Sequence, residues 1–302
     1  MRLRGNMDTM TSKFPISGCT IIRDAMTGAF CLFESMATML PLVDDMHVMD
    51  MGSTDNTLEL LHEIASANKR IHIHEKNYVW ENPIVLANAS NDVIALAQHN
   101  NILFWQADEI WHKNLVRGMV EMFASGICNT IFWRYQLRDN FQKIHWLPHI
   151  VHRVGNRKNG MFEFVGDGMN TKRIIDAKIC GGHHGGWPQW SGMLPTSIPP
   201  ADIPTQDMIL DVCSLGAFRD NLVERKKLHF PLWSESHFTI EGVNPDDWQR
   251  NAMSNEDWTK TTTPFSIPKI MRYHVGKVRY EIRPELLKAL RDDTTEDYLD
   301  GI

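Results

Sequence analysis

The sequence predicts an α/β fold, a mostly parallel sheet with helices on both faces. Strand-like and helix-like segments alternate over the first 136 of the 302 residues, which is typical of parallel sheets with crossover helices. Two of the strand-like segments also run directly into acidic residues, at Asp50 and at Asp108. In open sheets of this kind, ligands bind at the carboxyl ends of the strands.

The expected strands are short and rich in apolar or β-branched residues, and they lie at 19–23, 47–50, 71–75, 101–106 and 130–136. Two segments between them, 58–69 and 89–100, carry apolar residues at helical spacing. The residues of these two apolar faces are Leu58, Leu61, Ile64 and Ala65 in the first helix and Val93, Leu96 and Ala97 in the second.

Beyond residue 136 the alternation loosens into glycine-rich turns and a proline-marked loop. We expect a helix at about 207–228 and a strand at 269–276, followed by an acidic tail. Neither an internal repeat nor a linker long enough to separate domains is visible. The chain is therefore expected to form a single domain over 1–302, with a first half at 14–136, a second at 137–285 and a solvated tail at 286–302.

Composition excludes some classes of function. The formal net charge of −6 argues against a generic binder of nucleic acids or anionic membranes. Locally, however, residues 134–158 are basic and carry interleaved aromatic residues. The five cysteines form no CxxC pair, and several lie in apolar runs, which indicates buried free thiols in a reducing compartment. Neither a secretory signal nor a membrane-length apolar run is visible, so a cytoplasmic protein without a membrane span is expected.

The most informative stretch is ILFWQADEIW, residues 102–111, in which four bulky apolar residues run into Gln106-Ala-Asp-Glu109. A carboxylate at the end of a buried strand is costly unless something cationic meets it. That partner could be a metal ion, an arginine or lysine, or only water.

A second stretch, VMDMGSTDNT at 48–57, places Asp50 at the end of a strand. Gly52 permits a tight turn, and Ser53 to Asn56 are suitable caps for the next helix. These residues alone are consistent with an ordinary strand–turn–helix connection. That interpretation leaves Asp50 unexplained, because it lies where a polar ligand would bind.

Together the two stretches resemble the motifs of family-2-type glycosyltransferases, which have the GT-A fold. DMGSTDNT is similar to the DDGSTDNT signature of that family, and QADE is similar to its DADE, the DxD motif. Their order and spacing also agree, and the resemblance covers residues 14–125 well. It implies an enzyme of the hexosyltransferase type that uses a nucleoside diphosphate sugar, usually a UDP-sugar, together with Mn²⁺ or Mg²⁺.

The resemblance also implies roles for individual residues. In the first half, Thr20, Arg23 and Asp50 would contact the base and ribose. Gln106, Ala107 and Asp108 would line the donor site, with Asp108 on the metal. In YHVGKVRYE, residues 273–281, His274 would complete the metal site, and Lys277 and Arg279 would lie near the diphosphate.

Inverting members of the family carry their general base 60–100 residues beyond the DxD motif, so the resemblance implies a base in that interval. Asp167, between two glycines, fits that interval, and Glu163 and Asp176 are alternatives. The second half would then hold the acceptor and complete the metal site.

The sequence departs from the family at Gln106, where the first DxD aspartate is replaced by a neutral amide. This leaves open a non-catalytic GT-A-like protein that binds a nucleotide or a glycan. A nucleotidyltransferase is disfavoured, because CTIIRDAMTGAF lacks a glycine-rich basic loop. The acceptor would be a saccharide or, given the basic and aromatic residues at 134–158, a hydroxylated nucleobase in modified DNA.

Overall fold

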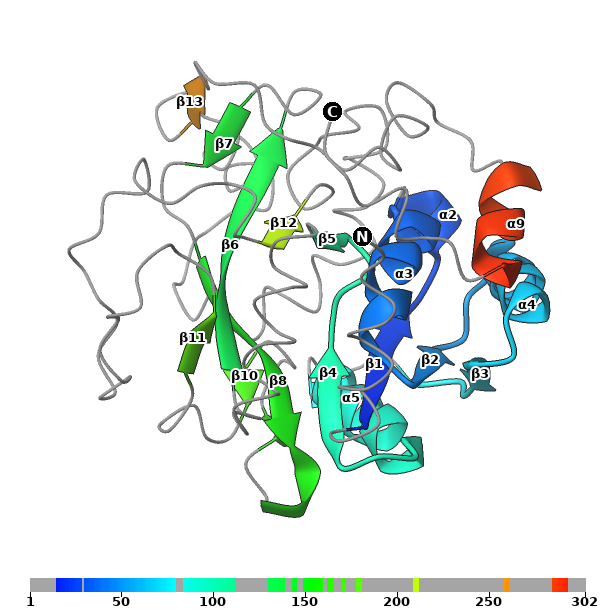
Figure 1. The fold of residues 1–302 in the computed structure, drawn as a ribbon, viewed down its shortest axis with the longest axis horizontal. Coiled ribbons are helices and arrows are strands. Elements are labelled where there is room, and N and C mark those ends of the chain that lie inside the picture. Colours follow the sequence, from blue (N-terminus) through cyan, green and yellow to red (C-terminus); the bar gives the residue numbers. More distant parts are fainter. Residues whose placement is uncertain are drawn as a thin grey trace.

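The sheet found in the structure is mixed: one half is parallel, and the other half combines antiparallel and parallel pairs (Figure 1). The computed structural model describes residues 15–28, 30–79, 84–111, 130–138, 143–145, 149–159, 162–165, 170–171, 178–180, 209–211, 258–260 and 284–292. Within these residues the main path of the sheet has the strand order β13-β7-β6-β8-β4-β1-β2-β3. Strands from both halves of the chain thus share one sheet.

The parallel half is the part that the sequence predicted best. Its strands are β1 (Ile16–Ile22), β2 (Asp45–Asp50), β3 (Ile71–Glu75) and β4 (Asn101–Phe104). β1 lies between β2 and β4, and β3 pairs with the other side of β2, all in parallel. The connecting helices are α4 (Thr57–Ala67) and α5 (Ile84–Leu96), which confirms the alternation of strand and helix.

Two further helices precede β2. They are α2 (Ala25–Gly28) and α3 (Leu32–Met39), and a 3₁₀ turn, η1 (Leu40–Leu42), follows α3. The sequence prediction did not include α3, although Glu34, Ser35 and Thr38 stand at helical spacing within it. All eight residues of this helix are buried in the structure.

The other half of the sheet is built from the second part of the chain. β6 (Thr130–Arg138) pairs with β8 (His149–Asn156), and β8 pairs with β4 of the parallel half. The expected boundary at residue 136 therefore falls inside a strand. The shorter elements are β5 (Glu109–Trp111), β7 (Lys143–His145), η2 (Arg157–Asn159), β9 (Phe164–Val165), β10 (Asn170–Thr171), β11 (Lys178–Cys180), β12 (Ile209–Asp211) and β13 (Trp258–Lys260).

One expected helix is contradicted at its start. Residues 209–211, within the helix expected at 207–228, form strand β12, which pairs with β5 and β6. A short apolar run such as Met208-Ile-Leu210 is compatible with either structure, so periodicity alone could not decide. The strand expected at 269–276 lies outside the described residues.

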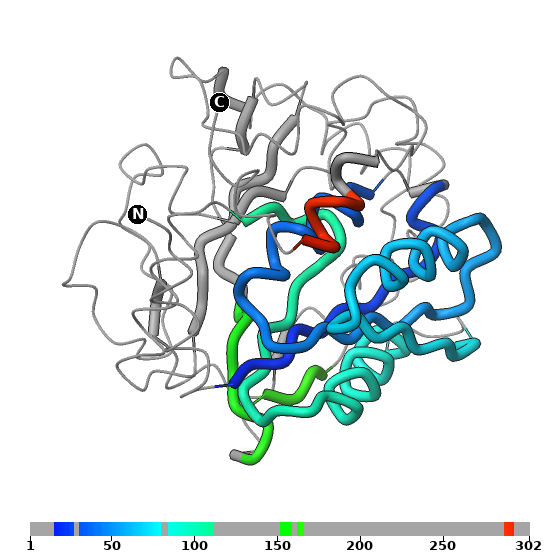
Figure 2. Tube along the Cα trace, turned by 45° about the vertical axis from the view of Figure 1, so that its right-hand side comes forward, coloured from blue at the N-terminus to red at the C-terminus, as the bar shows by residue number. Residues whose placement is uncertain are grey.

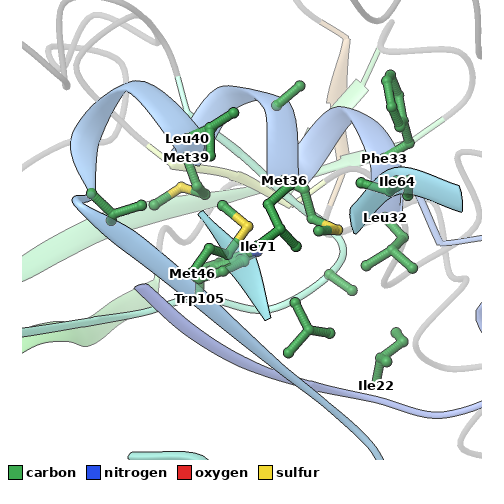
Figure 3. Packing of buried hydrophobic residues seen from close by; sticks show 14 of the residues in the cluster. Ile22, Leu32, Phe33, Met36, Met39, Leu40, Met46, Ile64, Ile71 and Trp105 are labelled. Carbon is green, nitrogen blue, oxygen red and sulfur yellow. The ribbon is translucent and has the colours of Figure 1, made fainter. Parts of the chain in front are cut away.

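The core lies on both faces of the parallel half. On one face, α3 and α4 cover the sheet, and Leu32, Met36 and Met39 of α3 pack toward Met46 and Trp105 (Figure 3). On the other face, α5 covers the sheet through a second cluster that includes Val93, Phe104 and Phe164. The buried cysteines Cys19 and Cys31 are free thiols, as expected.

The tail expected at 286–302 is not wholly solvated. Residues Pro284–Arg291 form helix α9, which lies beside α4 (Figures 1 and 2). Leu290 is fully buried in the core, and its carbonyl accepts a hydrogen bond from the Asn68 side chain at 2.9 Å. The solvated tail was predicted from the acidic composition at the end of the chain, and the apolar face of this helix was overlooked. Among the described helices, none is long and apolar enough to cross a membrane.

Candidate functional site

Polar residues gather at the carboxyl edge of the parallel half, directly after its strands. Arg23 and Asp24 follow β1, Asp50 ends β2, and Gln106 lies two residues beyond β4. Because the carboxyl ends of parallel strands meet at the same edge, residues far apart in the sequence come together there. This is the edge at which the sequence predicted a ligand.

Asp50 holds the turn that follows β2. One carboxylate oxygen accepts hydrogen bonds from the backbone N–H of Gly52 at 3.1 Å and of Ser53 at 3.0 Å, and the other accepts the Ser53 hydroxyl. Gly52 has a φ of 86°, so the tight turn that required glycine is confirmed. Just before helix α4, the Asp55 carboxylate accepts the Thr57 N–H at 2.9 Å, and the N-cap residue Asn56 makes no side-chain cap bond.

Asp24 ties the end of β1 to the same turn. Its Oδ1 accepts the backbone N–H of Thr54 at 2.6 Å, and its own N–H donates to the Ser53 hydroxyl at 2.9 Å. Its other oxygen lies 3.3 Å from Nε of Arg23. The side chain of Arg23 is 22% exposed and thus remains accessible from solvent. The sequence prediction missed Asp24, and its only signal was an acidic residue directly after Arg23.

Thr20 lies deeper than its expected role requires. It is fully buried, and its hydroxyl donates to the backbone carbonyl of Trp105 at 2.7 Å. This bond fastens β1 to the chain leaving β4. In the structure, Thr20 therefore positions the Gln106–Glu109 turn.

The Gln106–Glu109 turn, which we call the acidic turn, is closed by its own backbone and held from α3. The N–H of Glu109 donates to the Gln106 carbonyl at 3.0 Å. The Ser35 hydroxyl donates to the carbonyls of Glu109 and Gln106, at 2.8 and 3.2 Å. The Cys31 thiol lies 3.6 Å from the Ala107 carbonyl. The turn is thus fixed on a packed helix.

One carboxylate of the acidic turn, that of Glu109, has a cationic partner inside the protein. Its carboxylate is met by Arg153 of β8, with N–O distances of 3.0 Å and 3.1 Å from Nε and 2.7 Å from Nη2. The side chains are 1% and 0% exposed, so this is a fully buried ion pair. Glu109 Oε2 also accepts the N–H of Gln106 at 3.2 Å, which couples the pair to the backbone of the turn.

Asp108 and Gln106 are the remaining polar side chains of the acidic turn. Asp108 is 9% exposed and Gln106 is partly exposed. Both offer oxygen ligands, which suit a hard cation such as Mg²⁺ or Mn²⁺. Within the described part of the chain, however, no three His, Cys, Asp or Glu residues are grouped closely enough to hold a metal ion. The fit of a cation is therefore partial, and the rest of its coordination would come from the phosphates or from other residues.

Four of the expected site residues cannot be placed. Asp167, His274, Lys277 and Arg279 lie outside the described residues, as does the alternative base Asp176. The other alternative, Glu163, is exposed and lies one residue before β9.

Part of the basic stretch at 134–158 lies inside the protein. Arg153 is buried in its pair with Glu109, and His152 is buried against Phe162. Arg157 donates to the backbone carbonyl of Ile94 at the end of α5, at 2.9 Å. Composition alone could not separate these engaged side chains from cations on the surface.

A polar cavity of about 420 Å³ lies beside the turn after β2, lined by Lys76, Asn77, Tyr78, Val79, Asn88, Asn91 and Asp92. The N–H of Lys76 donates to the Asp50 carbonyl at 3.0 Å, so the cavity adjoins the candidate site. Asp92 accepts the Tyr78 hydroxyl at 2.7 Å and also pairs with Lys76. Burial and the bond to Asp92 raise the pKa of Tyr78 above its ordinary value, so Tyr78 stays a neutral donor.

The chain resembles solved structures of glucosyl-3-phosphoglycerate synthase from Mycobacterium tuberculosis and of TarS from S. aureus. The synthase in complex with Mn²⁺, UDP-glucose and phosphoglyceric acid is 18% identical, with 44% of this chain and 47% of that chain covered and a TM-score of 0.32.

Its complex with Mg²⁺ and UDP is 16% identical over 54% of this chain and 63% of that one, with a TM-score of 0.36. TarS is 15% identical over 42% and 22% of the two chains, with a TM-score of 0.30. Similarity at this level carries no information about substrates, and the match spans less than two thirds of each of these proteins.

No curated protein sequence matches the chain. The model of the family described as glycosyl transferase family 2 matches residues 32–185, just over half of the 302 residues. This range contains the turn after β2, the acidic turn and Arg153. The chain therefore belongs to glycosyl transferase family 2.

Proposed function

We propose that the protein is a metal-dependent glycosyltransferase that moves a sugar from a nucleoside diphosphate sugar, a UDP-sugar, to an acceptor hydroxyl with inversion at the anomeric carbon. The observation that carries this proposal is the acidic turn. It lies at the ligand-binding edge of the sheet, is fixed by Ser35 and Arg153, and presents Asp108. Membership of the family supplies the class of reaction.

The nucleoside is proposed to bind over the ends of β1 and β2. Arg23 is accessible there and can donate to the base or the ribose, and Asp50 orients the turn beneath it. The adjoining cavity offers Lys76, Tyr78 and Asn77 as donors and acceptors for ribose hydroxyls. Thr20 contributes by placing the acidic turn, through its bond to Trp105.

Asp108 would hold Mn²⁺ or Mg²⁺, with Gln106 as a neutral oxygen ligand or a donor to a ribose hydroxyl. When bound, the cation offsets the charge that develops on the leaving diphosphate. Since Glu109 is paired with Arg153, that pair adds no net charge to the turn. His274 is proposed as a further metal ligand, and Lys277 and Arg279 as cations near the phosphates, from their places in the sequence.

The acceptor hydroxyl would lose its proton to a carboxylate as its oxygen attacks the anomeric carbon. Asp167 is the residue that the sequence favours for this role. A saccharide is the proposed acceptor. Modified DNA is the weaker alternative, because Arg153 and His152 are buried and Arg157 is bonded to the backbone at the end of α5, which reduces the basic surface on which that idea rested.

A binding protein without turnover is the second candidate, and Gln106 favours it. Release of UDP from UDP-glucose, with and without Mn²⁺, separates the two functions. We expect metal-dependent release that falls by at least two orders of magnitude in Asp108→Ala. Metal-dependent binding of UDP-glucose without any release would favour the binding protein. Equal release by the wild-type protein and Asp108→Ala would refute the proposed role of the acidic turn.

A further inference from the structure

Three histidines form a stack on β2 and β3 that the proposed reaction does not use. They are His47 of β2 and His72 and His74 of β3, and we call them the histidine stack. The ring centroids of His47 and His74 are 5.2 Å apart, and those of His47 and His72 are 5.0 Å apart. Because successive residues of a strand point to opposite faces, His72 and His74 share one face, while Ile71 and Ile73 pack into the core on the other.

The stack is linked to a buried carboxylate by a chain of hydrogen bonds. Nε2 of His47 lies 3.1 Å from Oδ2 of Asp45, and its Nδ1 lies 2.9 Å from Nε2 of His74. Burial acts to raise the pKa of Asp45, but its hydrogen bonds, chiefly that from His47, outweigh this effect and lower the pKa. An ionised carboxylate only accepts, so His47 donates from Nε2, and its bare Nδ1 accepts from His74 when both rings are neutral.

This chain can take up one proton but not two. With one added proton, the charged ring donates to its neutral neighbour, and the bond between His47 and His74 is kept. A second proton leaves two N–H groups facing each other at 2.9 Å, so the bond is lost and two like charges lie side by side. Burial, together with the charges of His47 and His72, lowers the pKa of His74, so this ring is neutral at neutral pH. His72 and His74 are half-buried, so protons reach them from solvent.

The surroundings of the stack offer one counter-charge, that of Asp45. The titratable side chains that β1, α5 and the adjoining loops bring to this face are Cys19, Asp92, His99, Arg157, Lys76 and Tyr78. Burial raises the pKa of the Cys19 thiol, which is therefore uncharged. Asp92 is paired with Lys76 and accepts the Tyr78 hydroxyl, and the remaining two side chains can only add positive charge. Among the described residues, a second proton on the stack is thus without a counter-charge.

The stack is not arranged as a metal site. Two imidazole nitrogens on one tetrahedral Zn²⁺ would lie about 3.3 Å apart, further than the 2.9 Å between His47 and His74. The described residues also bring together no three His, Cys, Asp or Glu side chains that could hold an ion. The separation is that of a hydrogen bond, so the ligand of this site is a proton.

The position of the stack connects it to the donor site. Among the described strands, β3 pairs with β2 alone and ends the sheet (Figure 1). Two residues after His74, the N–H of Lys76 donates to the Asp50 carbonyl at 3.0 Å, and residues 76–79 then line the cavity proposed for the ribose. The bond between His47 and His74 therefore lies close to the point where this cavity wall joins the sheet.

We propose that the histidine stack makes the attachment of β3 and residues 76–79 to β2 sensitive to acid. At neutral pH the chain of hydrogen bonds holds this edge, and a second proton breaks the chain and releases the edge. The sign follows from linkage, since a histidine with a lowered pKa contributes stability that is complete above its unfolded pKa of about 6.5 and is lost as the pH falls below it. A nucleotide bound against residues 76–79 opposes the release, and this last link rests on the proposed function.

The test is hydrogen–deuterium exchange of the nucleotide-free protein at about pH 7.5 and about pH 5.5, on either side of the ordinary histidine pKa. After correction for the intrinsic exchange rate, protection of residues 71–79 in the wild-type protein should fall about tenfold at the lower pH. The reason is that a released ring with a pKa of about 6.5 binds a proton that the stack excludes. Protection of β4, which carries no ring of the stack, should change by less than about twofold.

Two variants separate the stack from histidines in general. His74→Gln should abolish the acid effect, because the amide donates to Nδ1 of His47 at either pH and takes up no proton. The matched control is His62→Gln. His62 is an exposed histidine of α4 that pairs with Glu75 at the end of β3, and its loss should leave the tenfold fall intact.

Equal protection of residues 71–79 at the two pH values in the wild-type protein overturns the proposal, whatever the variants do. So does a fall of the same size in His74→Gln, or a fall that is abolished by His62→Gln. UDP with Mn²⁺, added at the lower pH, should restore the protection of residues 76–79. UDP that binds in a calorimetric titration but leaves this exchange unchanged refutes the link to the donor site. A protein that binds no UDP at either pH refutes the proposed function, while exchange in the free protein still decides the acid effect.

Discussion

The buried pair of Glu109 and Arg153 gives the most quantitative prediction. Changing Arg153 to Met removes the cation and leaves the Glu109 carboxylate in a site with no exposed surface. Breaking a buried pair by removing one partner typically costs about 3–5 kcal/mol, because the remaining charge is uncompensated. We therefore expect Arg153→Met to lower the free energy of unfolding by about that amount.

The same reasoning predicts a different result when both charges are removed. In Glu109→Leu/Arg153→Met no unpaired charge remains, and such replacements are often neutral or stabilising by about 1–4 kcal/mol. Glu109 Oε2 also accepts the Gln106 N–H, so the loss of that one hydrogen bond costs about 1 kcal/mol. The double variant should thus be more stable than the Arg153→Met single variant by several kcal/mol.

The assay is urea unfolding followed by tryptophan fluorescence, with Lys158→Met as the control. Lys158 is an exposed cation five residues from Arg153, and its loss should change stability by no more than about 0.5 kcal/mol. The reasoning is refuted if Arg153→Met lies within 1 kcal/mol of the wild-type protein. It is also refuted if the double variant is no more stable than the single one.

Three further outcomes are expected. Gly52→Ala should lower the free energy of unfolding, measured in urea, by about 1–3 kcal/mol, because alanine is strained at a φ of 86° and its Cβ would lie 2.6 Å from Asn77 Oδ1. A loss below about 0.5 kcal/mol would contradict this geometry. Leu290→Ala should lower the free energy of unfolding by about 2–5 kcal/mol, because its side chain is buried. Lys288→Ala, on the exposed side of α9, should lower it by less than about 0.5 kcal/mol. Equal effects would mean that α9 does not pack on the core. Burial, with a smaller contribution from the Arg153 charge, lowers the pKa of His152 to about 4. Between that value and the unfolded value of about 6.5 the unfolded state binds more protons, so this residue should remove about 3 kcal/mol of stability as the pH falls from 7 to 4. His152→Leu should remove that pH dependence of stability. The effect is measured as a difference from the wild-type protein, because His74, whose pKa burial also lowers, is present in both proteins. Identical pH profiles of the two proteins would refute a neutral buried His152.

The parallel half could be predicted from the sequence because its signals are local. Residues 71–75 were expected as a strand and form β3 with the same bounds, and 47–50 falls within β2. Gly52 marks its turn by residue type alone, since a positive φ favours glycine. The bonds from the turn to the Asp50 carboxylate were not predicted, because Asp50 was assigned to contact with the ligand.

The rest of the site depends on contacts between distant residues. The sequence could not predict that Arg153, 44 positions away, neutralises Glu109. The type of a charged residue does not reveal whether its side chain is buried. For the same reason the buried Arg153 and His152 were interpreted as part of a basic surface. Asp211 was expected in a helix, and only pairing with β5 and β6 places it beside the acidic turn.

The central claim is that Asp108 holds a divalent cation together with the diphosphate of a donor. Isothermal titration of UDP into the wild-type protein and into Asp108→Asn, each with and without Mn²⁺, tests it most directly. We expect UDP binding to the wild-type protein to tighten at least tenfold with Mn²⁺. We expect no effect of Mn²⁺ on Asp108→Asn, with Tm unchanged. Binding of UDP that is indifferent to Mn²⁺ in the wild-type protein, or equally metal-dependent in both proteins, would contradict it.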